Sequence, residues 1–225
     1  MKKKLIFLAY LVASLLLLYF GLGWFGVFKV YSIPTTSGEP NLNVGSKVIV
    51  SNLSKPELGK IMVYKNIDSF PKINYFTFRL CGMPGDTVQI KNGVLFVNGK
   101  NFDEGLSLHH AYTLEFENNA QLGKELSENE NISVFMQVQR ELYYIHTDEK
   151  TAAAYGAKRF IQKPDEPDKY VEAIYNQPWN NNHFGPLVIP EGKFFLLGDS
   201  RDNAMDSRQV GLIDKDAWVG NVVYH

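Results

Sequence analysis

The chain has 225 residues, and its 23 lysines and arginines almost balance its 24 aspartates and glutamates, which gives a formal net charge of −1. Nucleic-acid-binding proteins normally carry a clustered excess of basic residues, so this balance gives no reason to expect a nucleic-acid partner. Hydrophobic residues make up 45% of the chain, which excludes wholesale disorder, and the single cysteine, Cys81, excludes an intrachain disulfide and a CxxC site.

The first residues of the chain predict a membrane anchor. Three lysines are followed by an uncharged run from Leu5 to Phe28, long enough as a helix to cross a hydrocarbon core of roughly 30 Å. A cleavable signal peptide is the alternative, but its apolar stretch is normally only about 7–15 residues long. We therefore predict an uncleaved transmembrane helix over 5–28 of a single-pass protein of the cytoplasmic (inner) membrane. Cations collect on the cytoplasmic side, which places residues 1–4 inside and residues 29–225 outside.

Residues from Lys47 onward predict a mainly β domain. Short apolar or β-branched runs recur between Gly, Pro and Asn residues, a pattern typical of strands separated by turns. The runs are 48–50, 61–64, 75–80, 87–90, 94–97, 194–197 and 219–224. Asn92-Gly93 lies between two of them and is a strong hairpin signal.

A polar segment from about 101 to 185, called the insertion below, interrupts this pattern. Apolar residues at 112–114 and 142–145 predict strands within it, and the polar stretch 119–130 predicts a solvated helix or loop. The sequence therefore predicts one β core domain that carries a β-rich insertion.

The segment 33–42, called the Ser37 loop below, is the first of three unusual segments. It holds the adjacent hydroxyls of Thr35, Thr36 and Ser37 between two prolines, as expected for an exposed loop. It is either a plain linker from the membrane to the domain or a nucleophile loop. In the second case Ser37 attacks a carbonyl, and Thr35 or backbone N–H groups stabilise the oxyanion.

The other two segments follow predicted strands. Residues 78–86 contain Gly-x-Pro-Gly-Asp, which by itself indicates a turn. Residues 198–208 contain two arginines, three aspartates and an asparagine directly after an apolar run. Side chains of this kind can satisfy one another as a charged network that supports a site.

Taken together and in this order behind an N-terminal anchor, these segments resemble type I signal peptidases. Those are membrane-anchored serine endopeptidases that cut signal peptides from exported precursors. Residues 35–42 are similar to the family pattern Ser-Gly-Ser-Met-x-Pro-Thr-Leu, and residues 78–86 to Lys-Arg-x-x-Gly-x-Pro-Gly-Asp. Residues 198–208 are similar to Gly-Asp-x-Arg-Asp-Asn-Ser-x-Asp-Ser-Arg, and 94–99 and 184–190 also look like family segments.

The resemblance implies a signal-peptidase-like β core and assigns roles by position. Ser37 occupies the nucleophile position, and Thr35 together with Ser37 occupies the oxyanion position. The charged network that it implies around the site consists of Arg79, Asp199, Arg201, Asp206 and Arg208. The implied partners are the signal peptides of exported precursors and the lipid bilayer, with a membrane protein as a further option.

The departures from the family pattern concern the chemistry itself. The family activates its serine with a lysine whose pKa is lowered by burial, and orients that lysine with a serine hydroxyl. The residues at those two positions are Phe78, whose ring cannot accept a proton, and Ala204. In the Ser37 loop, Gly38 and Asn41 replace the family's Met and Thr. The base and its orienting partner are therefore absent together.

A displaced base is one alternative. Lys72 lies six residues before Phe78, which is about 20 Å along a strand, but a loop that folds back could bring it or Lys65 to Ser37. The histidines in or near the insertion are expected at the surface; they are His109, His110 and His183.

We therefore expect a signal-peptidase homologue that keeps the fold, the anchor and an extended-peptide cleft, with little or no dyad catalysis. An active peptidase with a displaced or partner-supplied base, and an envelope scaffold that never binds signal peptides, are the alternatives. No cofactor is expected, because the sequence contains neither a metal-ligand cluster nor a phosphate-binding glycine loop.

Overall fold

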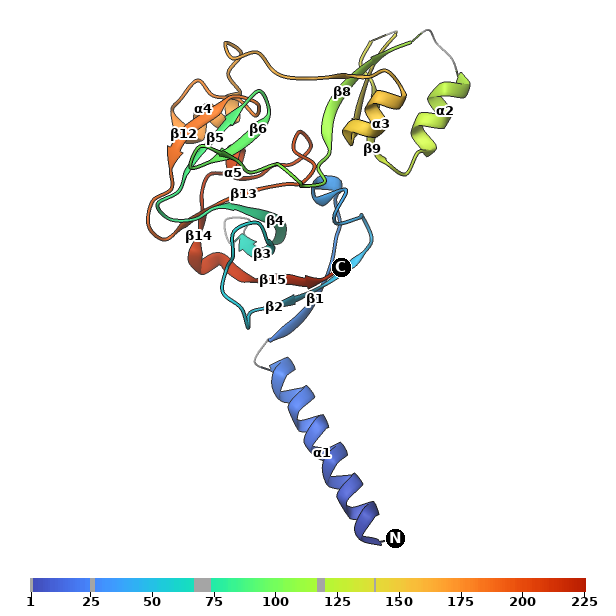
Figure 1. Cartoon of the computed structure of the whole chain (residues 1–225), viewed down its shortest axis with the longest axis vertical. Helices are drawn as coiled ribbons and strands as arrows, with labels where there is room; N and C mark the ends of the chain where they lie inside the picture. The colour runs from blue at the N-terminus through green and yellow to red at the C-terminus, as the bar shows by residue number, and fades with distance from the viewer. Residues whose placement is uncertain (1, 25–26, 67–73, 117–119, 140) are drawn as a thin grey trace.

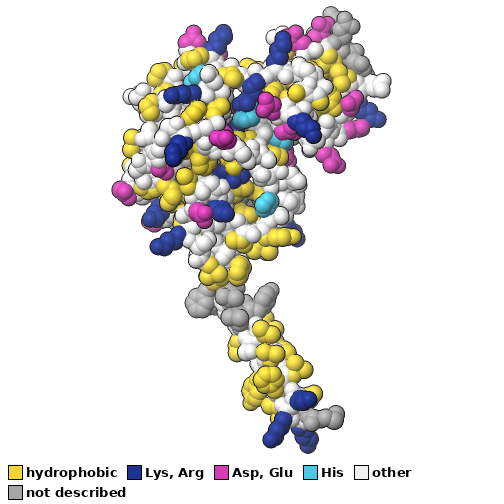
Figure 2. Space-filling model, viewed as in Figure 1, with side chains coloured by type: hydrophobic (Ala, Val, Ile, Leu, Met, Phe, Trp, Pro, Cys, Tyr) yellow, Lys and Arg dark blue, Asp and Glu magenta, His cyan; other side chains and the backbone are white. Residues whose placement is uncertain are grey.

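The computed structural model describes residues 2–24, 27–66, 74–116, 120–139 and 141–225. A long N-terminal helix, α1 (Lys2–Trp24), leads into a β domain, and the insertion projects from the far side of that domain (Figure 1). The helix begins with lysines and carries exposed apolar side chains along its length (Figure 2).

Among the described residues, none of the helices combines the length and the hydropathy that crossing a bilayer requires. The anchor expected over 5–28 therefore stays a prediction. Its expected end differs from the structure, because α1 stops at Trp24 and Phe28 is the first residue of a strand. That strand pairs antiparallel with residues 47–51, and its Phe, Val and Tyr side chains favour extended backbone.

The main sheet has seven strands in the order β1-β2-β15-β3-β4-β13-β14. Their bounds are β1 (Phe28–Ser32), β2 (Lys47–Ser51), β15 (Trp218–Tyr224), β3 (Ile61–Asn66), β4 (Asn74–Gly82), β13 (Lys193–Leu197) and β14 (Ile213–Asp214). The strands expected at 48–50, 61–64, 75–80, 194–197 and 219–224 all form, and the mainly β fold is confirmed. The short helix α5 (Ser207–Val210) and the 3₁₀ turn η2 (Lys215–Ala217) lie between β13 and β15 in the chain.

A smaller sheet has the order β12-β5-β6-β7. Its strands are β12 (Phe184–Val188), β5 (Thr87–Lys91), β6 (Val94–Val97) and β7 (Lys100–Asn101). The predicted hairpin between β5 and β6 is confirmed, because Asn92 and Gly93 both adopt the positive φ angles that a tight two-residue turn requires. Helix α4 (Lys169–Tyr175) packs its buried Val171 into a hydrophobic cluster formed by side chains of this smaller sheet. This part of the expected insertion therefore contacts the core.

The rest of the insertion has its own sheet, in the order β11-β8-β10-β9. Its elements are β8 (His110–Glu115), α2 (Ala120–Glu128), β9 (Ile132–Gln137), β10 (Leu142–Thr147), α3 (Glu149–Ala154) and β11 (Lys158–Arg159). Most of the stretch expected as a solvated helix or loop is the helix α2, but α2 buries Leu126 completely. The insertion therefore contains a sheet together with helices.

The insertion meets the core beside the third segment. His109 and Ser200 form a parallel bridge, in which the His109 N–H donates to Asp199 O and the Arg201 N–H donates to His109 O. This bridge brings the beginning of β8 against the loop that follows β13.

Candidate active-site cleft

A cleft of about 400 Å³ lies between the Ser37 loop and β4. Its lining is aliphatic, aromatic and hydroxyl-bearing, from Tyr31, Ser32, Ile33, Pro34, Thr35, Thr36, Ser37, Gly38, Leu42, Tyr75, Phe76, Thr77, Phe78, Asn203 and Met205. None of the described residues that line it is Lys, Arg, His, Asp or Glu. The structure thus brings the Ser37 loop, the second segment and the third segment to one place.

Ser37 lies on a tight turn, the 3₁₀ turn η1 (Thr36–Gly38). Its hydroxyl lies 2.9 Å from that of Thr35, and its carbonyl accepts a hydrogen bond of 3.1 Å from the Ser200 N–H. Asn203 donates to the Thr36 hydroxyl over 2.6 Å. The turn is thus held from the third segment, and the two hydroxyls implied as nucleophile and oxyanion donor are neighbours.

Phe78 lines the cleft and is also part of the hydrophobic core. Only 5% of it is exposed, and it clusters with Met62, Tyr64 and Leu80. Burying a phenylalanine side chain stabilises a fold by about 1.5–3 kcal/mol. The position implied for the base therefore contributes packing to the core.

Gly198 is the point at which Phe78, Ala204 and Ser37 meet. A Cβ added to Gly198 would clash with Ala204 and would lie 2.8 Å from the Ser37 carbonyl oxygen and 3.5 Å from Phe78 Cε1. Ala204 also packs against the cluster that contains Phe78. The two positions that depart from the family pattern are thus neighbours in space, next to the backbone of Ser37.

Of the two lysines considered as a displaced base, only Lys65 is described, and it does not line the cleft. Lys72 falls outside the described residues. Lys65 pairs with Tyr75 on β4, whereas Phe78 pairs with Met62. Lys65 is three positions from Met62 along the strand, a distance of about 10 Å.

None of the three histidines considered from the sequence lines the cleft beside Ser37, and two of them are not at the surface. His109 is buried with Nδ1 3.1 Å from the Ser133 hydroxyl, and His110 lies between Asp202 and Arg159. The expectation of surface histidines was wrong for these two, because the insertion folds back over them. His183 is half-buried, and its Nε2 lies 3.0 Å from Gln162 O.

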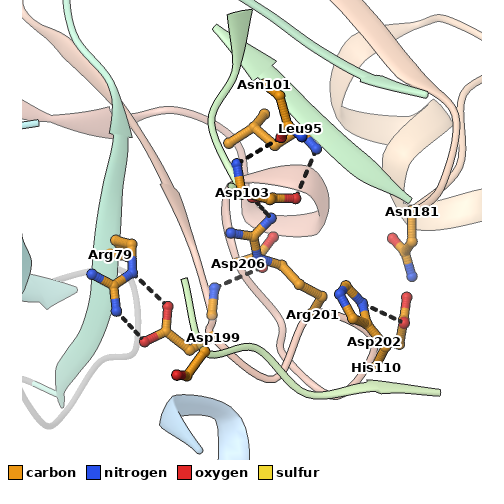
Figure 3. A network of polar contacts seen from close by, with 12 residues as sticks. Arg79, Leu95, Asn101, Asp103, His110, Asn181, Asp199, Arg201, Asp202 and Asp206 are labelled. Carbon is orange, nitrogen blue, oxygen red and sulfur yellow. Dashed lines mark hydrogen bonds and ion pairs between the residues drawn. The ribbon is translucent and has the colours of Figure 1, made fainter. Parts of the chain in front are cut away.

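The charged network begins with Arg79 and Asp199. Arg79 binds the carboxylate with two nitrogens, over 2.7 Å from Nε and 2.6 Å from Nη2 (Figure 3). It also donates to Gly59 O with Nη1. Such bidentate pairs are short, charge-assisted and geometrically specific. The pair joins β4 to the loop that follows β13.

Asp206 and Arg208 form a second, fully buried pair behind the cleft. Arg208 donates to the Asp206 carboxylate from Nε over 2.8 Å, and Asp206 accepts the Gly198 N–H over 3.1 Å and caps α5. Arg201 forms a third pair, 2.7 Å from Asp103 (Figure 3). All five residues implied as the network are thus paired, but they support the backbone around the cleft and do not line it.

Some contacts at the site could not be inferred from the sequence. The rings of Tyr31 and Tyr75 lie 5.0 Å apart at the mouth of the cleft, and burial raises the pKa of the Tyr31 hydroxyl. Their separation in the chain hides this pairing. In the part of the chain that the structure describes, no group of three His, Cys, Asp or Glu side chains could hold a metal ion.

A family model described as "Signal peptidase, peptidase S26" matches residues 4–225. The chain belongs to the S26 signal peptidase family. The resemblance inferred from the motifs is thus confirmed by a match that spans nearly the whole chain.

Two relatives illustrate this membership. Signal peptidase I of Bacillus licheniformis is 28% identical over 199 residues, which cover 86% of this chain and 74% of the relative. Signal peptidase IB of Staphylococcus aureus (strain Mu50 / ATCC 700699) is 29% identical over 231 residues, which cover 100% of this chain and 90% of the relative. A crystal structure of a signal peptidase I from Enterococcus faecalis V583 covers 76% of this chain and 100% of its own at 21% identity, with a TM-score of 0.38.

Proposed function

We propose that this S26 family member binds the signal peptides of exported precursors in the cleft and does not cleave them. Family membership and two relatives named as signal peptidases support the choice of substrate. The observation that carries the loss of chemistry is Phe78 at the base position, packed in the core beside Ala204 and the Ser37 backbone.

The chemistry of the cleft supports this division between binding and catalysis. A serine hydroxyl is a weak nucleophile until a neighbouring base removes its proton, and no Lys or His lines the described cleft. The aromatic and aliphatic lining instead suits an apolar peptide segment. Tyr31 and Ser32 belong to β1, an edge strand of the main sheet, so an extended peptide would gain main-chain hydrogen bonds by pairing beside it.

The test measures cleavage and binding separately. Full-length protein in detergent is incubated with a secretory precursor, and a photo-crosslinkable signal peptide measures binding. We expect no cleavage above that of Ser37→Ala, together with crosslinks to the cleft. Cleavage that disappears in Ser37→Ala would overturn the loss of catalysis, and capture of membrane proteins with no precursor would favour a scaffold.

A matched pair of tyrosine variants shows whether the cleft is the binding site. Tyr75 lines the cleft and is 46% exposed, whereas Tyr170 on α4 is 53% exposed and lies outside it. We expect Tyr75→Ala to weaken peptide binding about tenfold through lost aromatic contact, and Tyr170→Ala to leave it unchanged. Equal effects of the two variants would place the binding site elsewhere.

The membrane anchor is part of the same proposal. Its support is the sequence, in which cations precede an uncharged run over 5–28, together with the exposed apolar side chains of α1. A lipid bilayer would cover those side chains and place residues 29–225 outside the cytoplasmic membrane. Protease added outside spheroplasts should digest the β domain. If the domain resists protease in intact spheroplasts and is digested only after lysis, it lies in the cytoplasm and the proposed orientation is wrong.

A further inference from the structure

The beginning of the insertion is bonded to the third segment, which is also bonded to the Ser37 loop. The His109 N–H donates to Asp199 O over 3.0 Å, and the Arg201 N–H returns a bond of 2.9 Å to His109 O. Between these partners, the Ser200 N–H donates to Ser37 O over 3.1 Å. One short stretch of the third segment therefore contacts the insertion and the Ser37 loop at the same time.

Asn41 adds a side-chain connection to this backbone one. Its Nδ2 group donates to Ser107 O over 2.8 Å and to Asp199 Oδ2 over 2.8 Å. Ser107 belongs to the insertion, and Asp199 is the partner of Arg79. A single amide thus joins the Ser37 loop, the buried ion pair and the insertion.

The residue type at position 41 decides whether this connection can exist. An asparagine NH₂ group has two protons and can donate to two acceptors at once, whereas a threonine hydroxyl has one proton. The family pattern has Thr at this position, as described above. The two hydrogen bonds from Asn41 to Ser107 O and to Asp199 therefore depend on the asparagine that this chain has at position 41.

We propose that Asn41 is a positioning residue through which the insertion controls the peptide-binding cleft. This inference rests on the proposed function and deepens it, because it names how the cleft is regulated. The insertion, docked through residues 107–109, holds the Ser37 loop in the shape that the cleft requires. Since coupling between two sites is reciprocal, a peptide bound in the cleft also tightens the docking of the insertion.

The test variants differ in the number of hydrogen-bond donors on the side chain at position 41. Asn41→Thr keeps one donor and Asn41→Ala keeps none, and Asn43→Ala removes an exposed asparagine side chain from the chain just beyond the loop as the control. Asn41→Ala leaves Asp199 paired with Arg79, and Ser107 O lies where water can replace the amide. The domain should therefore stay folded in every variant.

The first measurement is hydrogen exchange of the full-length protein without peptide. Losing a net hydrogen bond speeds local exchange by about two- to tenfold. We expect this increase at the amides of 107–111 and 199–203 in Asn41→Ala, a smaller one in Asn41→Thr, and none in Asn43→Ala. Exchange that matches Asn43→Ala, or that rises over the whole domain, overturns the positioning role.

The second measurement uses a synthetic signal peptide as the probe. In the wild type, peptide should slow exchange at 107–111, which do not line the cleft, and in Asn41→Ala that remote protection should vanish while affinity falls about two- to tenfold. Remote protection that persists in Asn41→Ala contradicts the coupling. A wild type that binds no peptide would reject the proposed function alone, and the exchange rates measured without peptide would still decide the role of Asn41.

Discussion

Phe78, Ala204 and Ser37 approach one another around Gly198, and that arrangement defines the site at the scale of single residues. Phe78 points into an apolar cluster and ends beside the Ser37 backbone. A lysine in its place would be surrounded by apolar side chains, and burial of that kind lowers an amine pKa towards neutrality. Phe78 therefore lies in the kind of apolar surroundings that the resemblance implies for the base.

The double variant Phe78→Lys with Ala204→Ser should regain cleavage that depends on Ser37. A positioned general base typically contributes about 10²–10⁴-fold in rate. We expect a gain within this range over the same variant carrying Ser37→Ala, measured by precursor cleavage. Phe78→Met with Ala204→Ser, which lacks the amine, is the control. A well-folded double variant with no turnover would show that the Ser37 loop itself no longer supports catalysis.

Removal of Asp199 should cost far more stability than removal of a surface charge. Asp199→Ala leaves Arg79 without its partner in a pair whose side chains are only 2% and 11% exposed, and breaking such a pair costs about 3–5 kcal/mol. Lys124→Ala breaks an i,i+4 pair with Glu128 that is 74% and 66% exposed, so its effect should stay near 0.5 kcal/mol. Urea unfolding of both variants checks the difference, and equal losses would contradict the structural role of the network.

At the scale of whole elements, the junction between the insertion and the core contains three histidines with altered pKa values. Burial lowers the pKa of His109, His110 and His146, all of which lie at or beside this junction. Asp202 and Asp148 oppose this shift, while Arg159 and Arg201 reinforce it at His110. The three histidines are therefore neutral in the folded protein at neutral pH.

Acidification should weaken the fold at this junction. A histidine whose pKa is lower in the folded state stabilises the fold above its unfolded pKa of about 6.5, and this contribution disappears as the pH falls through the folded value. The pKa of Glu39 is raised by burial, so this carboxyl acts in the opposite direction at lower pH. Urea unfolding at about pH 7 and about pH 5 should show a loss of stability.

Histidine substitutions identify the source of that loss. Replacing His109, His110 and His146 together by Gln should reduce the difference in stability between the two pH values. His225→Gln, at an exposed terminal position, should leave the difference as it is in the wild type. A pH dependence that the triple variant retains in full would assign it to other groups.

At the scale of the whole molecule, α1 and the β domain have separate roles. The apolar side chains described along α1 are exposed, whereas the core clusters consist of residues of the β domain. Burial, not helix length, provides most of the stability of a fold. Removal of α1 should therefore leave the folding of the β domain nearly unchanged.

Deletion of residues 1–27 tests this separation. The shortened protein should unfold within about 2 °C of the full-length protein in detergent, because none of the described residues in this stretch belongs to a core cluster. It should no longer sediment with membranes, while the full-length protein should resist extraction at high salt. A large fall in the unfolding temperature would show that α1 packs on the domain, and sedimentation of the shortened protein would place the membrane contact elsewhere.

Local patterns in the sequence determined which strands form and which motifs accompany one another. The hairpin at Asn92-Gly93 and the runs that became β2, β3 and β13 depend on neighbouring residues, so periodicity and turn residues reveal them. The order of the three segments was sufficient for the family, and the amino acids at positions 78 and 204 are by themselves enough to mark the departures from its pattern. Nothing local, however, places those two side chains next to each other.

Only the tertiary structure shows which contacts are made by the residues that differ from the family pattern. Phe78 and Ala204 meet at Gly198, Asn41 reaches Ser107 and Asp199, and His109 is buried against the loop after β13, all through contacts between residues far apart in the chain. Such contacts depend on how the sheet and the insertion close over one another, and a chain read residue by residue does not contain that distance information. The sequence by itself therefore determined the family and the presence of Phe at position 78, whereas folding decided that Phe78 packs in the core and that the insertion is bonded to the loop after β13 and to the Ser37 loop.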